Sequence, residues 1–174
     1  NFLNRSAFFN IFVLMKHQNI NTEERANQAV AYFKDGYNCA QSVVMAYADL
    51  FDLEQTLAAR MAAPFGAGMG RLREVCGTVT GMFMIVGLAI PSDDPSDIQS
   101  RTRNYAMVQK LASRFRDENG SIICRELLGI ERKKESPKPE ARTEAYYKKR
   151  PCVELIRMSA TMLGEELKAL CRDE

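Results

Sequence analysis

The chain has 174 residues, of which 46% are hydrophobic and 26% are charged. A chain of this length can bury about 70% of its unfolded surface in one domain, and its composition is typical of a soluble globular protein. The formal net charge of +2 and the lack of a basic stripe interleaved with aromatic residues argue against nucleic-acid binding. The sequence contains no run of about 18 apolar residues, so we expect a protein that is not embedded in a membrane.

The first 20 residues differ in character from the rest of the chain. An apolar block from Ala7 to Met15 follows a single arginine and ends without a small-residue cleavage site. The only histidine, His17, lies in this stretch. Without a second histidine to bind the same metal ion, it is not expected to be a metal ligand. We therefore expect residues 1–20 to be a leader or flexible arm, and residues 21–172 to form a single helical domain.

Two capping patterns open the predicted domain. Asn21 with Glu24, and Asn38 with Gln41, have the spacing of an N-cap residue and its reciprocal partner. The second pattern starts a helix that runs to about residue 50 and places Cys39 in its first turn. A short alanine-rich helix follows over residues 54–63, and Pro64 is expected to end it.

A glycine-rich loop containing Gly66, Gly68 and Gly70 comes next. We interpret it as a tight crossing between chain segments. A phosphate cradle is the alternative, although no strand precedes the loop and no Lys-Ser/Thr follows it. Residues 73–90 are apolar around most of a helical circumference, which predicts the buried central helix of the fold.

The remaining segments also have helical patterns. A long helix is expected over residues 95–118, a short one after Ser121, and a last one from Pro151 to about Leu170. Residues 131–143 are charged and contain two prolines, which predicts a solvated connection. No alternating strand pattern appears. We expect an all-α fold, a compact bundle of five to seven helices with a glycine-rich loop before a buried central helix.

Four of the five cysteines share one local setting, since each lies in the first turn of a predicted helix. These are Cys39, Cys76, Cys124 and Cys152, whereas Cys171 lies in a charged tail and is expected to be a bystander. The odd cysteine count argues against a fully paired secreted scaffold and favours a reducing cytoplasmic setting. Helix starts can lower the pKa of a thiol, and inward-pointing Arg71, Arg73 and Arg125 would add to that effect.

Such a cluster has three interpretations. It can cycle between dithiol and disulfide, it can hold zinc or an iron–sulfur cluster as a four-thiolate site, or the four residues can be separate core cysteines that behave as small hydrophobes. If the four sulfurs meet, four different helices must deliver them.

Ordered motifs along most of the chain resemble the C-GCAxxG-C-C family of redox-active proteins. The matching pieces are GYNCAQSV (36–43), FGAGMGR (65–71), EVCGTVTG (74–81), NGSIICRELLG (119–129) and PCVELI (151–156). The family's Cys-Gly-Ala core reads Cys76-Gly77-Thr78 here. The resemblance implies an all-helical fold and four functional cysteines (Cys39, Cys76, Cys124 and Cys152), and many relatives are encoded beside transporter genes.

The leading hypothesis is dithiol–disulfide electron exchange, with Cys76 as the central thiolate, Cys39 as its partner, and Cys124 with Cys152 as a second pair. One alternative is a metal-binding module in which the same four cysteines hold zinc or an iron–sulfur cluster. Another is a non-enzymatic, redox-sensing partner of a membrane transporter or of a redox protein. These alternatives leave open whether the protein is an enzyme.

Overall fold

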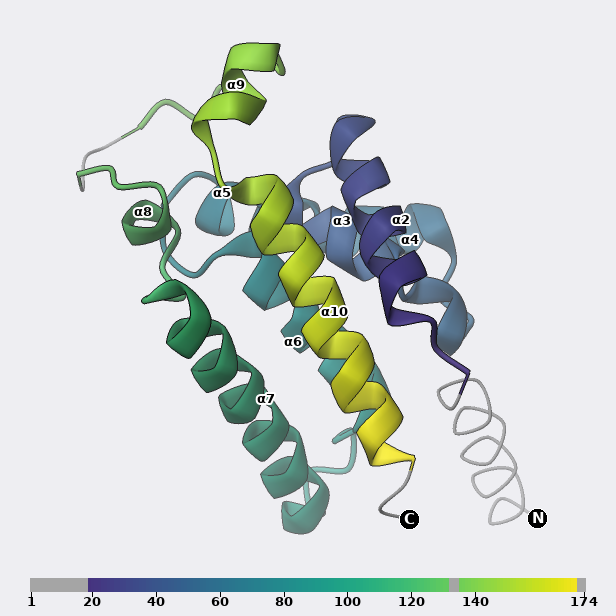
Figure 1. The fold of residues 1–174 in the computed structure, drawn as a ribbon. Coiled ribbons are helices and arrows are strands. Elements are labelled where there is room, and N and C mark those ends of the chain that lie inside the picture. The colour runs from purple at the N-terminus through teal and green to yellow at the C-terminus, as the bar shows by residue number, and fades with distance from the viewer. Residues whose placement is uncertain (1–18, 132–134, 172–174) are drawn as a thin grey trace.

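The computed structural model describes residues 19–131 and 135–171, and within these residues the protein is all-α, as predicted (Figure 1). The helices run over Thr22–Lys34 (α2), Cys39–Met45 (α3), Ala48–Phe51 (η1), Gln55–Ala62 (α4), Ala63–Phe65 (η2), Gly66–Met69 (α5), Gly77–Ala89 (α6), Ile98–Asn119 (α7), Cys124–Leu127 (α8), Glu144–Lys149 (α9) and Cys152–Leu170 (α10). Among the described residues, none of these helices is long and apolar enough to cross a membrane. The predicted arm lies outside the described residues up to position 18, and Ile20 is buried in the core.

The two predicted capping patterns start helices α2 and α3. Asn21 caps α2 through its side chain, and Asn38 with Gln41 forms a reciprocal capping box at the start of α3. Helix α3 ends earlier than predicted, before residue 50. A guanidinium nitrogen of Arg25 donates to the carbonyl oxygen of Ala46 at 2.7 Å, and this bond satisfies an acceptor at the helix end.

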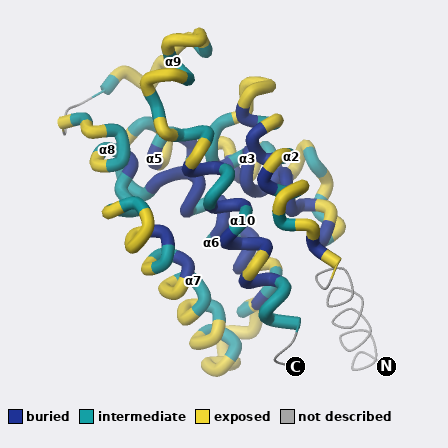
Figure 2. Tube along the Cα trace, in the orientation of Figure 1, coloured by how far each residue is buried: buried dark blue, intermediate teal, exposed yellow. Residues whose placement is uncertain are grey.

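Helix α6 is the buried central helix, although it is shorter than predicted. It packs against α3, α7 and α10, and Val79, Met82 and Ile85 on it are fully buried. Figure 2 shows this burial along α6 and along the inner face of α10, whereas the outer face of α7 is exposed. The helix begins at Gly77 and not at residue 73, because residues 74–76 pair with another part of the chain.

That pairing is a single antiparallel bridge between Val75 and Ile123. The amide of Cys76 donates to the carbonyl of Ile122 at 2.8 Å, and the amide of Cys124 donates to the carbonyl of Glu74 at 2.7 Å. These bonds hold residues 74–76 extended. They also set the starts of α6 and α8, and therefore two of the four cysteines, side by side.

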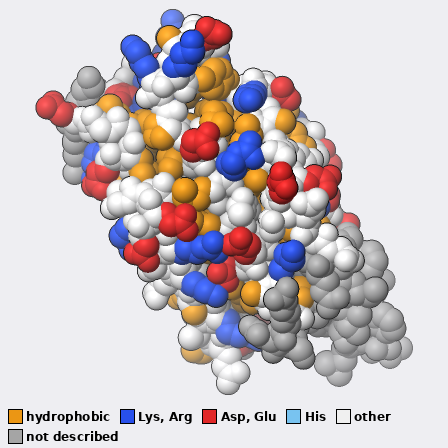
Figure 3. Space-filling view, in the orientation of Figure 1, with side chains coloured by type: hydrophobic (Ala, Val, Ile, Leu, Met, Phe, Trp, Pro, Cys, Tyr) orange, Lys and Arg blue, Asp and Glu red, His pale blue; other side chains and the backbone are white. Residues whose placement is uncertain are grey.

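Helices α7 and α10 form the long side of the bundle. Gly120, with φ of 78°, ends α7, and only Leu111 and Phe115 on this helix are fully buried. Helix α10 packs along α2 and α6, and the buried hydroxyl of Tyr47 donates to the carbonyl of Ala160 on α10 at 2.6 Å. Acidic and basic side chains are interspersed over the face shown in Figure 3.

The glycine-rich loop forms a left-handed turn, α5. All five residues from Ala67 to Arg71 have φ between 55° and 70°, and the amide of Gly70 donates to the carbonyl of Gly66 at 2.9 Å. This conformation costs roughly 1–2 kcal/mol for a residue with a side chain, and Ala67, Met69 and Arg71 all adopt it. Strained backbone of this kind concentrates at functional sites.

The connection after α8 is exposed over residues 136–141, as the sequence predicts for a solvated loop, but it is anchored to the bundle at Glu135. The side chain of Glu135 is only 11% exposed and is bound by Arg71 and Arg73. Pro137 and Pro139 line a cavity. We call residues 135–142 the cover segment. Charge and proline content predict its exposure, and what they do not predict is that Arg71 and Arg73 bind its acidic side chains.

Candidate functional site

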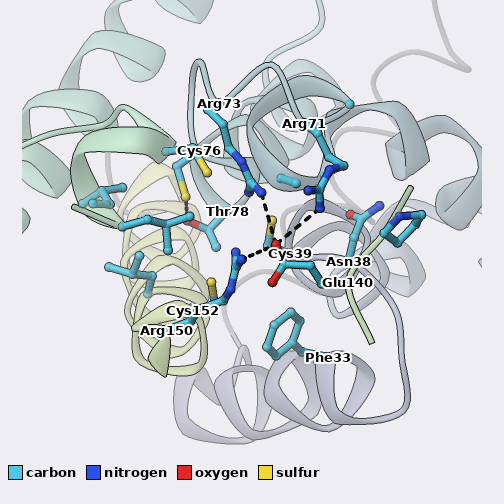
Figure 4. A pocket seen from close by; sticks show the side chains of 18 of the residues that line it. Phe33, Asn38, Cys39, Arg71, Arg73, Cys76, Thr78, Glu140, Arg150 and Cys152 are labelled. Atoms are coloured by element: carbon cyan, nitrogen blue, oxygen red, sulfur yellow. Dashed lines mark hydrogen bonds and ion pairs between the residues drawn. The ribbon is translucent and has the colours of Figure 1, made fainter. Parts of the chain in front are cut away.

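The four cysteines predicted to cluster line one cavity of about 230 Å³. They come from the starts of α3, α6, α8 and α10, which meet at the end of the bundle near α5 and α9 (Figure 1). Figure 4 shows Cys39, Cys76 and Cys152 around the cavity. All five cysteines of the chain are free thiols. Cys171 follows the far end of α10, about 28 Å from Cys152 at 1.5 Å per residue.

Two glycines pack directly against cysteines of the cavity. A Cβ atom on Gly77 would overlap the Sγ atom of Cys39, and a Cβ atom on Gly68 would lie 2.6 Å from the Cβ of Cys124. Cys39 Sγ is therefore packed directly against the residue that follows Cys76. The tight-crossing interpretation of the glycine-rich loop accounts for these contacts.

The residue that departs from the family pattern touches one of the sulfurs. Thr78 is completely buried, lines the cavity, and has its Oγ1 atom 3.3 Å from the Sγ of Cys76. Its hydroxyl therefore makes a hydrogen-bond contact that an alanine at this position would lack.

The electrostatics of the thiols differ from the sequence-based prediction. Burial raises the pKa of Cys76 and of Cys152 to about 12 and also raises the pKa of Cys124. The negative charge of a Cys39 thiolate adds to the rise in each case, and a hydrogen bond from Arg73 only partly offsets it at Cys124. The prediction that helix starts lower these pKa values is wrong for these three thiols. Cys76 is thus a neutral thiol near pH 7 and not the central thiolate.

Four arginines line the cavity. Two of them follow the glycine-rich loop, and two come from later in the chain. Arg71 and Arg73 point inward, as the sequence analysis supposed, and Arg142 and Arg150 join them. Arg125 instead binds the carboxylate of Glu74 at 2.9 Å.

Two carboxylates form ion pairs with these guanidinium groups. Glu135 lies 2.7 Å from Arg73 and 2.8 Å from Arg71. Glu140 lies 2.6 Å from Arg150, and Figure 4 shows it between Arg71, Arg73 and Arg150. Both acidic residues belong to the cover segment, so this segment is held over the cavity by charge.

Aromatic rings fix the orientation of the two additional arginines. The guanidinium of Arg142 stands 4.4 Å from the ring centre of Phe33 and 5.0 Å from that of Tyr146. The guanidinium of Arg150 stands 4.7 Å from the ring centre of Tyr146. Sequence reasoning did not assign Arg142 or Arg150 to the site. The available signal for Arg150 was its position directly before Pro151-Cys152, which ties it to the cysteine cluster.

In residues 19–131 and 135–171, no three Cys, His, Asp or Glu side chains are grouped closely enough to hold a metal ion. The cysteines named for a zinc or iron–sulfur site, Cys39, Cys76, Cys124 and Cys152, line the cavity without forming such a group.

A comparison with models of protein families places most of the chain in one family. A family model described as "Putative redox-active protein (C_GCAxxG_C_C)" matches residues 37–166, a range that contains all four clustered cysteines. No curated protein and no solved structure matches the chain.

Proposed function

Because this chain belongs to the C-GCAxxG-C-C family of redox-active proteins, we propose that it exchanges electrons by dithiol–disulfide chemistry of its four clustered cysteines. The observation that carries this proposal is the shared cavity, which brings together thiols from four separate helices. Isolated core cysteines would have no reason to line one solvent-accessible space. The family description supports a redox role in general, and the cavity is what favours thiol exchange.

Cys39 is the attacking sulfur in this scheme. Cys39 and Cys152 are half-buried, whereas Cys76 and Cys124 are buried. Burial raises the pKa of Cys152 to about 12, which leaves Cys39 as the more reactive of the two half-buried thiols. Burial is the main cause of the raised pKa of each of the other three thiols, and a thiolate at Cys39 adds to that rise. A thiolate, and not a thiol, is the nucleophile in exchange reactions.

The substrate in this scheme is a disulfide. The Cys39 thiolate attacks one sulfur, the substrate's S–S bond breaks, and the departing thiolate takes a proton from water. The Cys76 thiol then gives up its proton and attacks the Cys39 sulfur of the mixed disulfide. This step forms a Cys39–Cys76 disulfide and releases the second substrate thiol. The protein loses two electrons and the Cys76 proton, and the substrate gains these together with the proton taken from water.

Cys124 and Cys152 form the second pair. The negative charge of Cys124 raises the pKa of Cys152 further, so these two sulfurs are electrostatically coupled. Hydrogen bonding from Arg73 favours the thiolate of Cys124 over that of Cys152, which makes Cys124 the attacking sulfur of this pair.

The test uses protein purified without oxygen, on which metal content, visible absorption and free thiols are measured on one sample. Treatment with bis(2-hydroxyethyl) disulfide should remove thiols two at a time, and dithiothreitol should restore them. In the Cys39→Ser variant only the Cys124–Cys152 pair should respond, so two thiols are lost in place of four, whereas the matched Cys171→Ser variant should still lose all four. A stoichiometric bound metal with unreactive thiols would overturn the proposal in favour of the four-thiolate metal module.

A further inference from the structure

Three guanidinium groups converge on a single carboxylate oxygen at the cavity. The Oε1 atom of Glu140 lies 2.6 Å from Arg150 and 3.6 Å from each of Arg71 and Arg73 (Figure 4). Arginine is well suited to binding carboxylates because its planar fork of donors matches their geometry. The chain itself therefore places an anion beside the thiols.

The two glutamates of this cluster are held differently. Glu135 is 11% exposed, and its two oxygens bind the Nε and Nη2 atoms of Arg73 at 3.0 and 2.7 Å. This paired contact is structural. Glu140 is 47% exposed and has a single close contact, to Arg150. It is thus the carboxylate that another anion can replace.

Charge at the cavity favours such a replacement. Four arginines line it (Arg71, Arg73, Arg142 and Arg150), and two glutamates pair with them (Glu135 and Glu140). The balance of these six side chains is +4 − 2, or +2. Neutral thiols at Cys76, Cys124 and Cys152 do not change it, and the Cys39 thiolate of the proposed exchange lowers it to +1. Displacing Glu140 raises the positive charge that an incoming anion meets.

We propose that Arg71, Arg73 and Arg150 form a carboxylate subsite for the substrate, and that Glu140 occupies this subsite when no substrate is bound. The proposal rests on the dithiol–disulfide function and specifies its substrate class, a small disulfide that carries carboxylates. Arg150 lies two residues before Cys152, and the carbonyl of Glu74, the residue after Arg73, accepts a hydrogen bond from the amide of Cys124 at 2.7 Å. A carboxylate held by these arginines therefore brings its disulfide to the sulfurs. The electron balance is unchanged: two protein thiols become a disulfide, and the substrate disulfide becomes two thiols.

The test compares two disulfides of the same skeleton, 3,3′-dithiodipropionate, which is a dianion, and its neutral diamide. Rates of thiol loss are divided by the rates that the same reagents give with dithiothreitol, which removes their intrinsic reactivity. The normalised rate should be higher for the dianion. Arg150→Gln should lower the dianion-to-diamide ratio about tenfold, the typical loss for a charge-assisted hydrogen bond, and Arg150→Lys should lower it less.

Two further variants sharpen this result. Glu140→Gln removes the competing charge and should raise the dianion-to-diamide ratio. Arg103→Gln is the matched control, because Arg103 is exposed and lies near the start of α7, at the opposite end of the bundle. Its ratio should equal that of the unmodified protein. Equal normalised rates for the two disulfides, with no effect of Arg150→Gln on the ratio, would overturn the subsite while leaving electron exchange intact.

A second measurement does not depend on exchange. Suberate has the length of dithiodipropionate but no sulfur, so it can occupy the subsite without reacting. It should slow alkylation of Cys39 by iodoacetamide in the unmodified protein and have a weaker effect in Arg150→Gln. If neither disulfide oxidises the thiols but suberate still protects Cys39, the proposed function fails and the anion site stands. If suberate protects neither protein, the anion site fails.

Discussion

Charged side chains gather at two places along α10, and the two clusters are built differently. Away from the cavity, Lys110 and Arg114 of α7 bind Glu166 and Glu165 of α10, each at 2.6 Å. These pairs connect two regular helices and carry no excess of positive charge. At the cavity end, four arginines meet two glutamates that come from a loop. The first cluster joins helices, whereas the second leaves positive charge beside reactive groups.

The backbone also differs between the two regions, since one is regular and the other contains strained turns. The contact between α7 and α10 needs only regular helices. The cavity end needs the left-handed turn α5, a lone antiparallel bridge and glycines in close contact with cysteines. Such features are costly, so the comparison predicts that equivalent substitutions will be more damaging at the cavity end.

The largest difference is expected between two glycine-to-alanine substitutions. Gly68 has φ of 69°, and an added Cβ would lie 2.6 Å from the Cβ of Cys124 and 2.9 Å from the Cα of Arg73, whereas Gly87 in α6 has open space around it. Gly68→Ala should lower the free energy of unfolding by at least about 3 kcal/mol. Gly87→Ala should raise it by up to about 1 kcal/mol, because alanine favours the helix. Urea denaturation measures both changes. Equal effects of the two substitutions would contradict the prediction that the cavity end is the more sensitive region.

The next largest difference concerns the ion pairs. Arg73→Met leaves Glu135 buried without its two-bond partner, which should cost about 3 kcal/mol. Lys110→Met removes a partner whose side chain is 59% exposed, and should cost less than about 1 kcal/mol. Thermal and urea unfolding of the two variants test this order. A larger loss of stability for Lys110→Met would show that the ion pair between Arg73 and Glu135 does not stabilise the fold.

Alkaline pH should destabilise the cavity end. Burial raises the pKa of Cys76 and Cys152 to about 12, whereas a cysteine in the unfolded chain titrates near about 8.5. The folded state thus holds these two protons more tightly. Their contribution to stability is complete below about pH 8.5, and it is lost as the pH rises toward 12, at about 1.4 kcal/mol per pH unit for each thiol.

The matched comparison for this pH effect is the Cys76→Ser/Cys152→Ser double variant. Its free energy of unfolding should fall less steeply between pH 9 and 11 than that of the unmodified protein. Tyr47, whose pKa burial also raises, contributes equally to both proteins. Identical slopes would mean that the two thiols are not neutral in the folded state.

The smallest effect is expected at the hydroxyl beside Cys76. Thr78→Val keeps the volume of this buried residue but removes the contact between Oγ1 and Sγ. The free energy of unfolding should change by about 1 kcal/mol. The pKa of Cys76 should rise further, because the hydrogen bond from Thr78 lowers it. Slower alkylation of Cys76 at high pH would show the change, and an unaltered or faster rate would count against the contact.

Local patterns in the sequence predict much of the fold. The capping box of Asn38 and Gln41, the turn at Gly120 and the start of α10 at Pro151 all depend on neighbouring residues, so they can be read from the chain. The gathering of the four cysteines was predicted from their common position at helix starts. The caps and the turn follow from residues within one or two turns of each other, whereas the gathering of the cysteines rests on a local setting that four distant residues share.

The rest of the site depends on contacts between distant segments. Nothing near Glu135 or Glu140 indicates that arginines more than 60 residues earlier bind them. The direction of the thiol pKa shifts was also missed, because the helix-start effect is local whereas desolvation depends on the whole fold. The bridge between Val75 and Ile123 was hidden for the same reason, since a single pair leaves no alternating pattern.

The most direct test of the central claim is to determine which cysteines join under a controlled potential. The reduced protein is equilibrated without oxygen in glutathione buffers of graded potential, trapped with iodoacetamide, and analysed by peptide mass. We predict that the free thiols of Cys39 and Cys76 disappear together as one disulfide forms. The oxidised-to-reduced ratio should change tenfold for about 30 mV. Thiols that stay free across the range, or a disulfide that uses Cys171, would contradict the account.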